Sequence, residues 1–310
     1  MFNTATRKNI FSLIVLAALP VLLFQTRLLI VLAPLPLMYG HFQFGRAVFI
    51  VLSAFSMIAI SLMAPPALAL LYLMSTILVA LVYCEVAKKN KQIHALFVKS
   101  TLILLGCYLG LLLVLSQGHP YQFLDQTIKT MLTSLPQMVE QNARLSPWRA
   151  QAAEIAKNAS SLTALFLQEK LVGYLIGGLF FVFWITIIIL KSLNIQITST
   201  DLSRWKIPDQ FIWLFIISIV FNELPVPILS PVFRNIFIVM VILYFFQGLA
   251  ITTFYFHQKK ATKTSKNLIY AALLIFPLLA MAMGLLDIWI DFRTKLVKSH
   301  QRRINDESHS

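Results

Sequence analysis

Long stretches of this sequence carry no charged residue, and short segments rich in Lys and Arg separate them. The uncharged runs cover residues 9–26, 28–45, 47–84, 100–124, 171–190, 235–258 and 267–286. A helix that crosses a bilayer needs about 20 mostly apolar residues. Strands of a membrane barrel would alternate polar and apolar residues over about ten positions, whereas these runs are apolar on every side. The pattern therefore predicts an all-α, polytopic bundle of transmembrane helices.

The boundaries of the runs predict eight or nine spans. The run 47–84 is long enough for two helices, and Pro65-Pro66 divides it because proline interrupts the helical hydrogen-bond ladder. The second and seventh spans are short and lie beside prolines, which indicates broken or tilted segments there. We expect the spans near residues 10–25, 28–39, 46–63, 66–86, 96–117, 165–190, 208–223, 231–256 and 267–290.

Composition excludes a water-soluble domain. Of the 310 residues, 58% are hydrophobic and only 12% are charged, and the mean hydropathy is +0.78. Soluble domains carry about a quarter charged residues. The net charge of +14 comes from Lys and Arg at the ends of the runs, where positive charge sets orientation and meets anionic lipids. The expected partner is therefore the lipid bilayer and not nucleic acid.

Basic loops indicate the orientation. The segments 88–99 and 257–266 each contain four lysines and no acidic residue, which is typical of cytoplasmic loops. Arg7 and Lys8 then place the N-terminus in the cytoplasm of a cell with a bacterial inner (plasma) membrane. Nine full crossings would leave the C-terminus outside, yet the tail 293–310 is basic. Two explanations stay open: the ninth span re-enters, or an earlier short segment does not cross.

The loops also suggest a division of the chain. Residues 1–192 form a six-span membrane domain, 193–292 a C-terminal extension of two or three spans, and 293–310 a basic polar tail. The loop 118–164 has mixed charges and is expected on the external face. Apolar residues at helical spacing predict an amphipathic helix within it, interrupted by Pro136 and Pro147.

Three motifs resemble a known family. PLPLMYGHFQFGRAVFI (34–50) follows a first helix that begins near residue 10, and RNIFIVMVILYFFQGLAI (234–251) and GLLDIWIDFR (284–293) lie near the end. Together they place an Asn early and a Gly late in one helix, and then a Gly-x-x-Asp. These features resemble the YybS-like family of bacterial membrane proteins over most of the chain. The resemblance implies an integral membrane protein without an assigned activity.

The first six spans are also similar to the substrate-binding subunits of energy-coupling-factor vitamin transporters. Those subunits have six helices, a cytoplasmic N-terminus and an outward-facing pocket, so the resemblance implies a non-enzymatic component that binds or transports a small molecule. Two features differ. The first helix, IFSLIVLAALPVLLF, lacks the small-x-x-x-small spacing with which those subunits dock, and further spans follow the sixth. The alternative is a structural or assembly protein of the cell envelope, acting through helix contacts with a membrane-protein partner.

The strongest site candidate is Asp287, near the end of the last apolar run. A charge at the centre of a membrane helix costs about 2.5–3.5 kcal/mol on insertion scales, so depth decides what Asp287 does. In one interpretation it lies at the wet end of a span, with Asp291 paired to Lys295. In the other, Asp287 faces inward and pairs with Arg234 or the Asn235 amide, while Asp291 faces the headgroups.

Other polar residues at span ends are weaker candidates. Arg27 either extends to the outer interface or contacts an anionic ligand. Asn222 and Glu223 either cap the turn that follows the seventh span, or they face the outer side of the membrane and make a polar contact there. Gln247, next to Gly248, suits close helix packing with a side-chain hydrogen bond.

Signatures of catalysis are missing from the sequence. It contains no Gly-x-Ser-x-Gly, no His-Glu-x-x-His and no phosphate-binding or dinucleotide-binding glycine pattern. The six histidines are scattered, and Cys84 and Cys107 lie inside predicted spans without a neighbouring histidine at ligand spacing. We therefore expect no enzymatic activity, catalytic residue, metal or cofactor.

The orientation can be tested with one cysteine. An Asn90→Cys variant should resist membrane-impermeant thiol reagents added to intact cells, because the four lysines of segment 88–99 keep it in the cytoplasm. Ready labelling at this position would overturn the predicted topology.

Overall fold

The computed structural model describes residues 4–26, 29–89, 92–140, 147–195, 197–198, 201–224, 229–259 and 262–298. The chain is helical, and the described residues contain no strand. The expectation of an all-α membrane-type bundle is confirmed.

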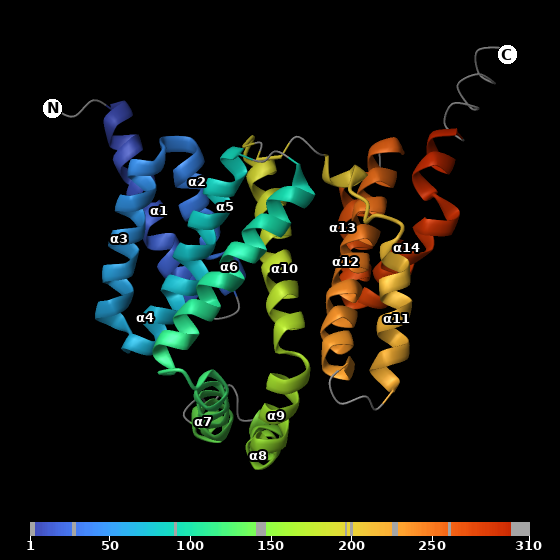
Figure 1. Cartoon of the computed structure of the whole chain (residues 1–310). Coiled ribbons are helices and arrows are strands. Elements are labelled where there is room, and N and C mark those ends of the chain that lie inside the picture. The colour runs from blue at the N-terminus through green and yellow to red at the C-terminus, as the bar shows by residue number, and fades with distance from the viewer. Residues whose placement is uncertain are drawn as a thin grey trace. The chain divides into compact units, whose positions relative to one another are not determined.

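The helices group into two compact units that are described separately (Figure 1). Unit 1 comprises Met1–Leu115 and Gly178–Thr200, and unit 2 comprises Ser116–Gly177 and Asp201–Ser310. The segment expected as an external loop, 118–164, therefore belongs to the same unit as the C-terminal helices.

The described part of unit 1 consists of six α-helices and the larger, C-terminal part of a seventh. Their bounds are α1 (Thr4–Gln25), α2 (Pro34–Phe44), α3 (Arg46–Met63), α4 (Pro66–Tyr72), α5 (Val79–Lys89), α6 (Ile93–Leu115) and the C-terminal part of α10 (Leu171–Ser192), with η1 (Ile30–Leu32) and η2 (Leu73–Leu78) between them.

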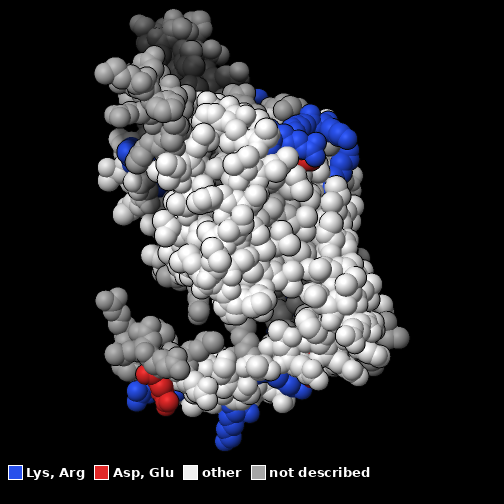
Figure 2. All heavy atoms as spheres, turned by 90° about the vertical axis from the view of Figure 1, so that its left-hand side faces the viewer, with Lys and Arg blue, Asp and Glu red and all other residues white. Residues whose placement is uncertain are grey.

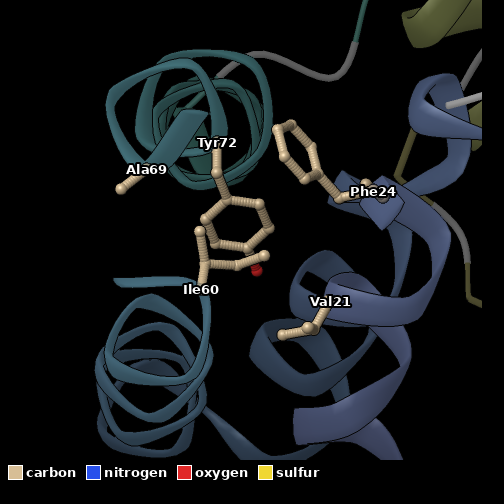
Figure 3. Close-up of a cluster of buried hydrophobic side chains, with 6 residues drawn as sticks. Val21, Phe24, Ile60, Ala69 and Tyr72 are labelled. Carbon is tan, nitrogen blue, oxygen red and sulfur yellow. The ribbon is translucent and has the colours of Figure 1, made fainter. Parts of the chain in front are cut away.

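Tyr72 lies at the centre of one core of unit 1. Its ring packs edge-on against Phe24 of α1 at a centroid distance of 5.1 Å and lies beside Ile60 of α3 (Figure 3). Both Tyr72 and Ile60 are completely buried. This aromatic contact holds α1, α3 and α4 together.

One span of unit 1 contains a π-helix. Pro66–Lys89 is long and apolar enough to cross a membrane as a single helix, but its middle, Leu73–Leu78, is wider than an α-helix. A π-helix shifts the hydrogen-bond ladder by one residue. The Tyr108 hydroxyl of α6 donates to the Met74 carbonyl at 3.2 Å, which gives a carbonyl of this segment a partner inside the bundle.

Unit 2 consists of the connecting helices and the C-terminal helices. Their bounds are α7 (Pro120–Glu140), α8 (Arg149–Lys157), α9 (Ala159–Glu169), the N-terminal part of α10, η4 (Leu202–Arg204), α11 (Phe211–Glu223), α12 (Leu229–Gln258), α13 (Lys263–Ile275) and α14 (Pro277–Ile290). The expectation of a partly helical 118–164 segment is confirmed, but α7 continues through Pro136 instead of ending there.

The described residues contain fewer helices that can cross a membrane than the eight or nine spans expected. Among them, five helices are long and apolar enough, or six if the pair α13 and α14 counts as one span. The second and seventh expected spans became α2 and α11, of 11 and 13 residues. At about 1.5 Å per residue, both are shorter than a hydrocarbon core of about 30 Å.

The ninth expected span is not one helix. It breaks at Phe276, and α13 and α14 meet at 98°. Pro277 begins α14, where its missing N–H costs nothing because the first helical residues have no intrahelical acceptor.

After α14 the chain turns back toward the end of α12 (Figure 1). Residues 292–298 are helical, and Leu296 lines the same cavity as Tyr255 and Phe256 of α12. The Tyr270 hydroxyl of α13 lies 2.7 Å from the Thr253 hydroxyl, so α13 begins at this end of α12 too. The beginning of α13 and the segment after α14 therefore lie at the same end of α12.

Helices α12 and α14 cross in close contact through glycines. A Cβ atom at Gly248 would meet the Ala280 carbonyl, and one at Gly284 would meet the Tyr244 carbonyl. Both obstacles are backbone atoms, so they cannot rotate away. Small residues of this kind let helix backbones approach closely in membrane proteins.

Gly248→Ala should therefore destabilise the protein, because the added methyl group pushes α14 away from α12. Overpacking costs about 1–3 kcal/mol, which should appear as a lower melting temperature in detergent. Gly106→Ala in α6 is the matched control, because nothing lies within 4 Å of a Cβ there. Equal melting temperatures for the two variants would contradict the close approach of α12 and α14.

Candidate functional site

The most deeply buried acidic side chain among the described residues is Asp287, near the end of α14. Its exposed fraction is 0%, so it faces inward. Arg293 donates from Nη1 to Oδ2 at 2.6 Å, and the Phe292 N–H donates to Oδ1 at 3.0 Å. The Gln247 side chain of α12 donates weakly to Oδ2 at 3.4 Å. We call Gln247, Asp287 and Arg293 the polar centre.

A tight turn brings Arg293 back to Asp287. Asp291 ends α14 in the left-handed conformation, with φ 47° and ψ 64°, which Asp and Asn tolerate better than most residues. Its own N–H donates to the Asp287 carbonyl at 3.0 Å. The Asp291 carboxylate then accepts a long hydrogen bond from the Thr294 N–H at 3.4 Å, as an N-cap does for the helix that follows.

Arg293 also holds the connector between α10 and α11. Its Nε donates to the Ser203 carbonyl at 3.2 Å, and its Nη2 donates to the Trp205 carbonyl at 2.8 Å. The connector is itself ordered by Asp201, whose carboxylate accepts from the Ser203 N–H and hydroxyl. One guanidinium therefore joins the end of α14 to two backbone carbonyls about 90 residues earlier in the chain.

Gln247 completes the centre from α12. Its Oε1 accepts from the Ile207 N–H at 2.9 Å, and its Nε2 donates to the Gly284 carbonyl at 2.9 Å. The side chain is completely buried. A buried amide with both ends satisfied stabilises a fold and fixes its geometry. Gln247 therefore links three segments: α12, α14 and the 201–207 connector.

The electrostatics of the centre depend on burial. Burial lowers the pKa of the Arg293 guanidinium, and the nearby Asp287 carboxylate opposes this shift. At the adjacent surface, the hydrogen bond from Thr294 lowers the pKa of Asp291. An arginine stays protonated in proteins, so Asp287 and Arg293 form an ion pair at 2.6 Å, with side-chain exposures of 0% and 12%.

The centre offers a carboxylate, a guanidinium and an amide within hydrogen-bonding distance of one another. Such a set can exchange partners: a cation can compete for Asp287, and an anion for Arg293. In the part of the chain that the structure describes, no three His, Cys, Asp or Glu side chains group as metal ligands.

The hypothesis that Asp287 pairs with Arg234 or Asn235 is wrong. Arg234 precedes Gln247 by almost four helical turns, about 20 Å along α12, and Gln247 is the α12 residue level with Asp287. Asn235 instead accepts from the Gly173 N–H of α10 at 2.6 Å and donates to the Pro231 carbonyl at 2.7 Å. Gly173 is in the first turn of α10, where the N–H has no helical acceptor, so Asn235 supplies one.

The three other candidates do not appear among the described contacts of the polar centre. Arg27 is outside the described residues, and so is the side chain of Glu223, the last residue of α11. Asn222 is half-buried near the end of the same helix.

Arg293 is the residue that sequence reasoning missed. It was counted as part of the basic tail, although it stands in the same GLLDIWIDFR motif as Asp287. A continuous helix would place positions 287 and 293 on different faces. Only the left-handed turn at Asp291 brings them together.

These observations define the chain as an all-helical membrane protein with a buried ion pair beside a broken helix. A family model described as "Predicted membrane protein (DUF2232)" matches residues 9–289, so the chain belongs to that family of predicted membrane proteins. No curated protein and no solved structure shows significant similarity to the chain.

Asp287→Asn should lower the melting temperature in detergent clearly. The change removes the negative charge and leaves Arg293 buried opposite a neutral amide, and breaking a buried ion pair from one side costs about 3–5 kcal/mol.

Asp291→Asn is the control for that experiment. Asparagine also tolerates the left-handed conformation and also caps helices, so the melting temperature should change little. If the two variants melt alike, the polar centre does not stabilise unit 2 and the stretch is only the wet end of a helix.

Proposed function

We propose that this protein is a non-enzymatic membrane component that binds or transports a small molecule, with the polar centre as the part that responds to it. One observation carries the proposal: a completely buried carboxylate, Asp287, lies against Arg293 near the end of the second helix of a pair that is broken at Phe276. Ionisable residues inside membrane helix bundles are rare, pair with one another, and mark substrate and ion pathways.

The broken helix pair supports this function. Discontinuous helices in transporters form binding sites near the middle of the bilayer, because their ends present unpaired backbone groups. Non-helical backbone at membrane depth is tolerated only where protein buries it or where it lines a cavity. Helix α14, which follows the break, contacts α12 through Gly284, whose carbonyl accepts a hydrogen bond from Gln247.

The proposed location is a bacterial inner membrane, with the N-terminus and the basic loops in the cytoplasm. Two features support it. The lysine-rich segments 88–99 and 257–266 have no acidic residues, as expected of cytoplasmic loops. In unit 2 the segment after α14 lies at the same end of α12 as the beginning of α13, so the described basic residues Arg293, Lys295 and Lys298 fall on the same side as Lys263 and Lys266. The 118–164 segment is then proposed to be external.

The resemblance in sequence to YybS-like proteins and to vitamin-transporter subunits supports a binding role and nothing more specific. A vitamin-binding subunit needs a pocket with aromatic and polar groups. The cavity of about 370 Å³ in unit 1 is lined by apolar residues only, among them Leu13, Val51 and Phe55. The proposed small molecule is therefore placed at the polar centre of unit 2 and not in unit 1.

A structural or assembly role is the second candidate. It is favoured by the contact of Gly248 and Gly284 with opposing backbone carbonyls, because such tight packing suits a rigid scaffold. The two candidates differ in what they require of Asp287. A scaffold needs it only for stability, whereas a binding component needs it for its ligand.

Mass spectrometry of small molecules retained on the purified full-length chain separates the candidates. The wild type should retain a small molecule at a fixed ratio to protein. Asp287→Asn, compared at equal amounts of folded protein from size-exclusion chromatography, should retain several-fold less. The matched control is Asp125→Asn, which removes a carboxylate from the partly exposed Asp125–Lys129 pair of α7. Absence of a retained molecule, or equal retention by both variants, would favour the scaffold.

A further inference from the structure

An apolar groove runs along the surface of unit 1 between α1 and α3. Its volume is about 370 Å³. The residues that line it are Leu13, Ile14, Ala17, Ala47, Val48, Val51, Leu52 and Phe55. None of these side chains carries a polar atom, so an occupant gains only hydrophobic and van der Waals contact there.

The groove opens outward. The exposed fractions of Ile14, Val51 and Phe55 on its walls are 61%, 66% and 59%, whereas Ala17 and Leu52 at its floor are buried. Both helices belong to a chain embedded in lipid. A hydrocarbon chain therefore fits the groove by shape and by chemistry.

One end of the groove is bordered by cations. Arg46 is the first residue of α3 and immediately precedes the groove residues Ala47 and Val48. Its Nε lies 3.7 Å from the Glu85 carboxylate, and Lys88 binds the same carboxylate at 3.0 Å. Figure 2 shows basic side chains gathered with an acidic one at the upper end of the view, next to a wide surface without charged side chains.

The charges at this end do not balance. Two cations share the single carboxylate of Glu85, so the cluster keeps a net positive charge. The Arg46 side chain is 66% exposed and that of Lys88 is 43% exposed. The 3.7 Å separation is an ion pair longer than a hydrogen bond, so the Arg46 guanidinium retains N–H donors for a phosphate. Arginine binds phosphate oxygens in a bidentate manner.

We propose that unit 1 binds an anionic phospholipid, with an acyl chain in the α1–α3 groove and the phosphate at Arg46 and Lys88. The apolar slot and the cations are contiguous, because Arg46 and Ala47 are adjacent on the first turn of α3. A phospholipid has the matching arrangement, because its charged phosphate lies at one end and its hydrocarbon chains extend from there.

A second copy of the chain is a poorer occupant. Packed symmetrically on the same face, it would bring its own Arg46 and Lys88 to the same edge, and like charges would repel. Free phosphate would use the cations but leave the groove to bulk lipid. A zwitterionic lipid would fill the groove but bring a choline cation to a positive cluster.

Native mass spectrometry of the full-length protein in detergent tests the proposal. Delipidated protein is titrated with phosphatidylglycerol or with phosphatidylcholine of the same acyl chains. The wild type should bind phosphatidylglycerol more tightly. Arg46→Gln should weaken that binding by about fivefold, which is the contribution of one cation near an anionic surface, while Arg46→Lys keeps the charge and should weaken it less.

Two further variants separate the groove from the charge. Ala47→Trp, at an exposed position, should block the groove and weaken both lipids while leaving the cations in place. Arg149→Gln, at an exposed position of α8, removes the same charge elsewhere and should change nothing.

Four outcomes overturn the proposal. One is equal affinity for the two lipids, and a second is equal behaviour of Arg46→Gln and Arg149→Gln. A third is competition by glycerol phosphate together with an unaffected Ala47→Trp variant, which would show a phosphate site without a groove. The fourth is a dimer mass that Ala47→Trp removes, which would assign the face to a second copy of the chain.

Discussion

Burying a carboxylate inside a helix bundle that lies in a bilayer is unfavourable by several kcal/mol unless a cation and further donors meet it. Asp287 is buried in this way, and much of the arrangement of unit 2 meets its requirements. The chain must reverse at Asp291 so that Arg293 reaches it. The guanidinium has more donors than one carboxylate accepts, so the 201–207 connector supplies carbonyls from Ser203 and Trp205.

Gln247 shows how this requirement extends into the packing of the helices. Its amide reaches the Gly284 carbonyl because α12 and α14 cross in close contact, and that contact is possible because Gly248 and Gly284 have no side chains. The polar network and the glycine contact therefore depend on each other. A larger residue at the crossing would lengthen the hydrogen bonds of the centre as well as disturb the packing.

The sequence predicts the helices well where charge-free runs are long, and less well where a proline decides the outcome. The expected spans 46–63 and 231–256 agree closely with α3 (Arg46–Met63) and α12 (Leu229–Gln258). The expected span 267–290 does not, because Pro277 is compatible with a kink in one helix and with the start of a second. Which of the two occurs depends on tertiary contacts with α12. At Pro136 the sequence predicts an interruption, whereas the structure has a continuous helix, because α7 tolerates the proline.

Some residues of the candidate site can be recognised in the sequence, and one cannot. Asp287 stands out in an apolar run because a charge there requires an explanation, and Gln247 stands out because it is a polar residue deep in another run. Their partner Arg293 does not, since its position follows from one left-handed residue. Backbone handedness at a non-glycine residue is set by the surrounding structure, so helical spacing alone assigns Arg293 to the wrong face.

The sequence separation within the ion pair has a consequence for biosynthesis. Asp287 is made six residues before its counter-ion and about 80 residues after the connector that steadies Arg293. The carboxylate of α14 is therefore neutralised only once the segment after Asp291 has folded back. A chain that stops before Arg293 carries every helix from α1 to α14 but lacks the residue that joins the end of α14 to the 201–207 connector, so its last helix keeps a buried carboxylate with no counter-ion.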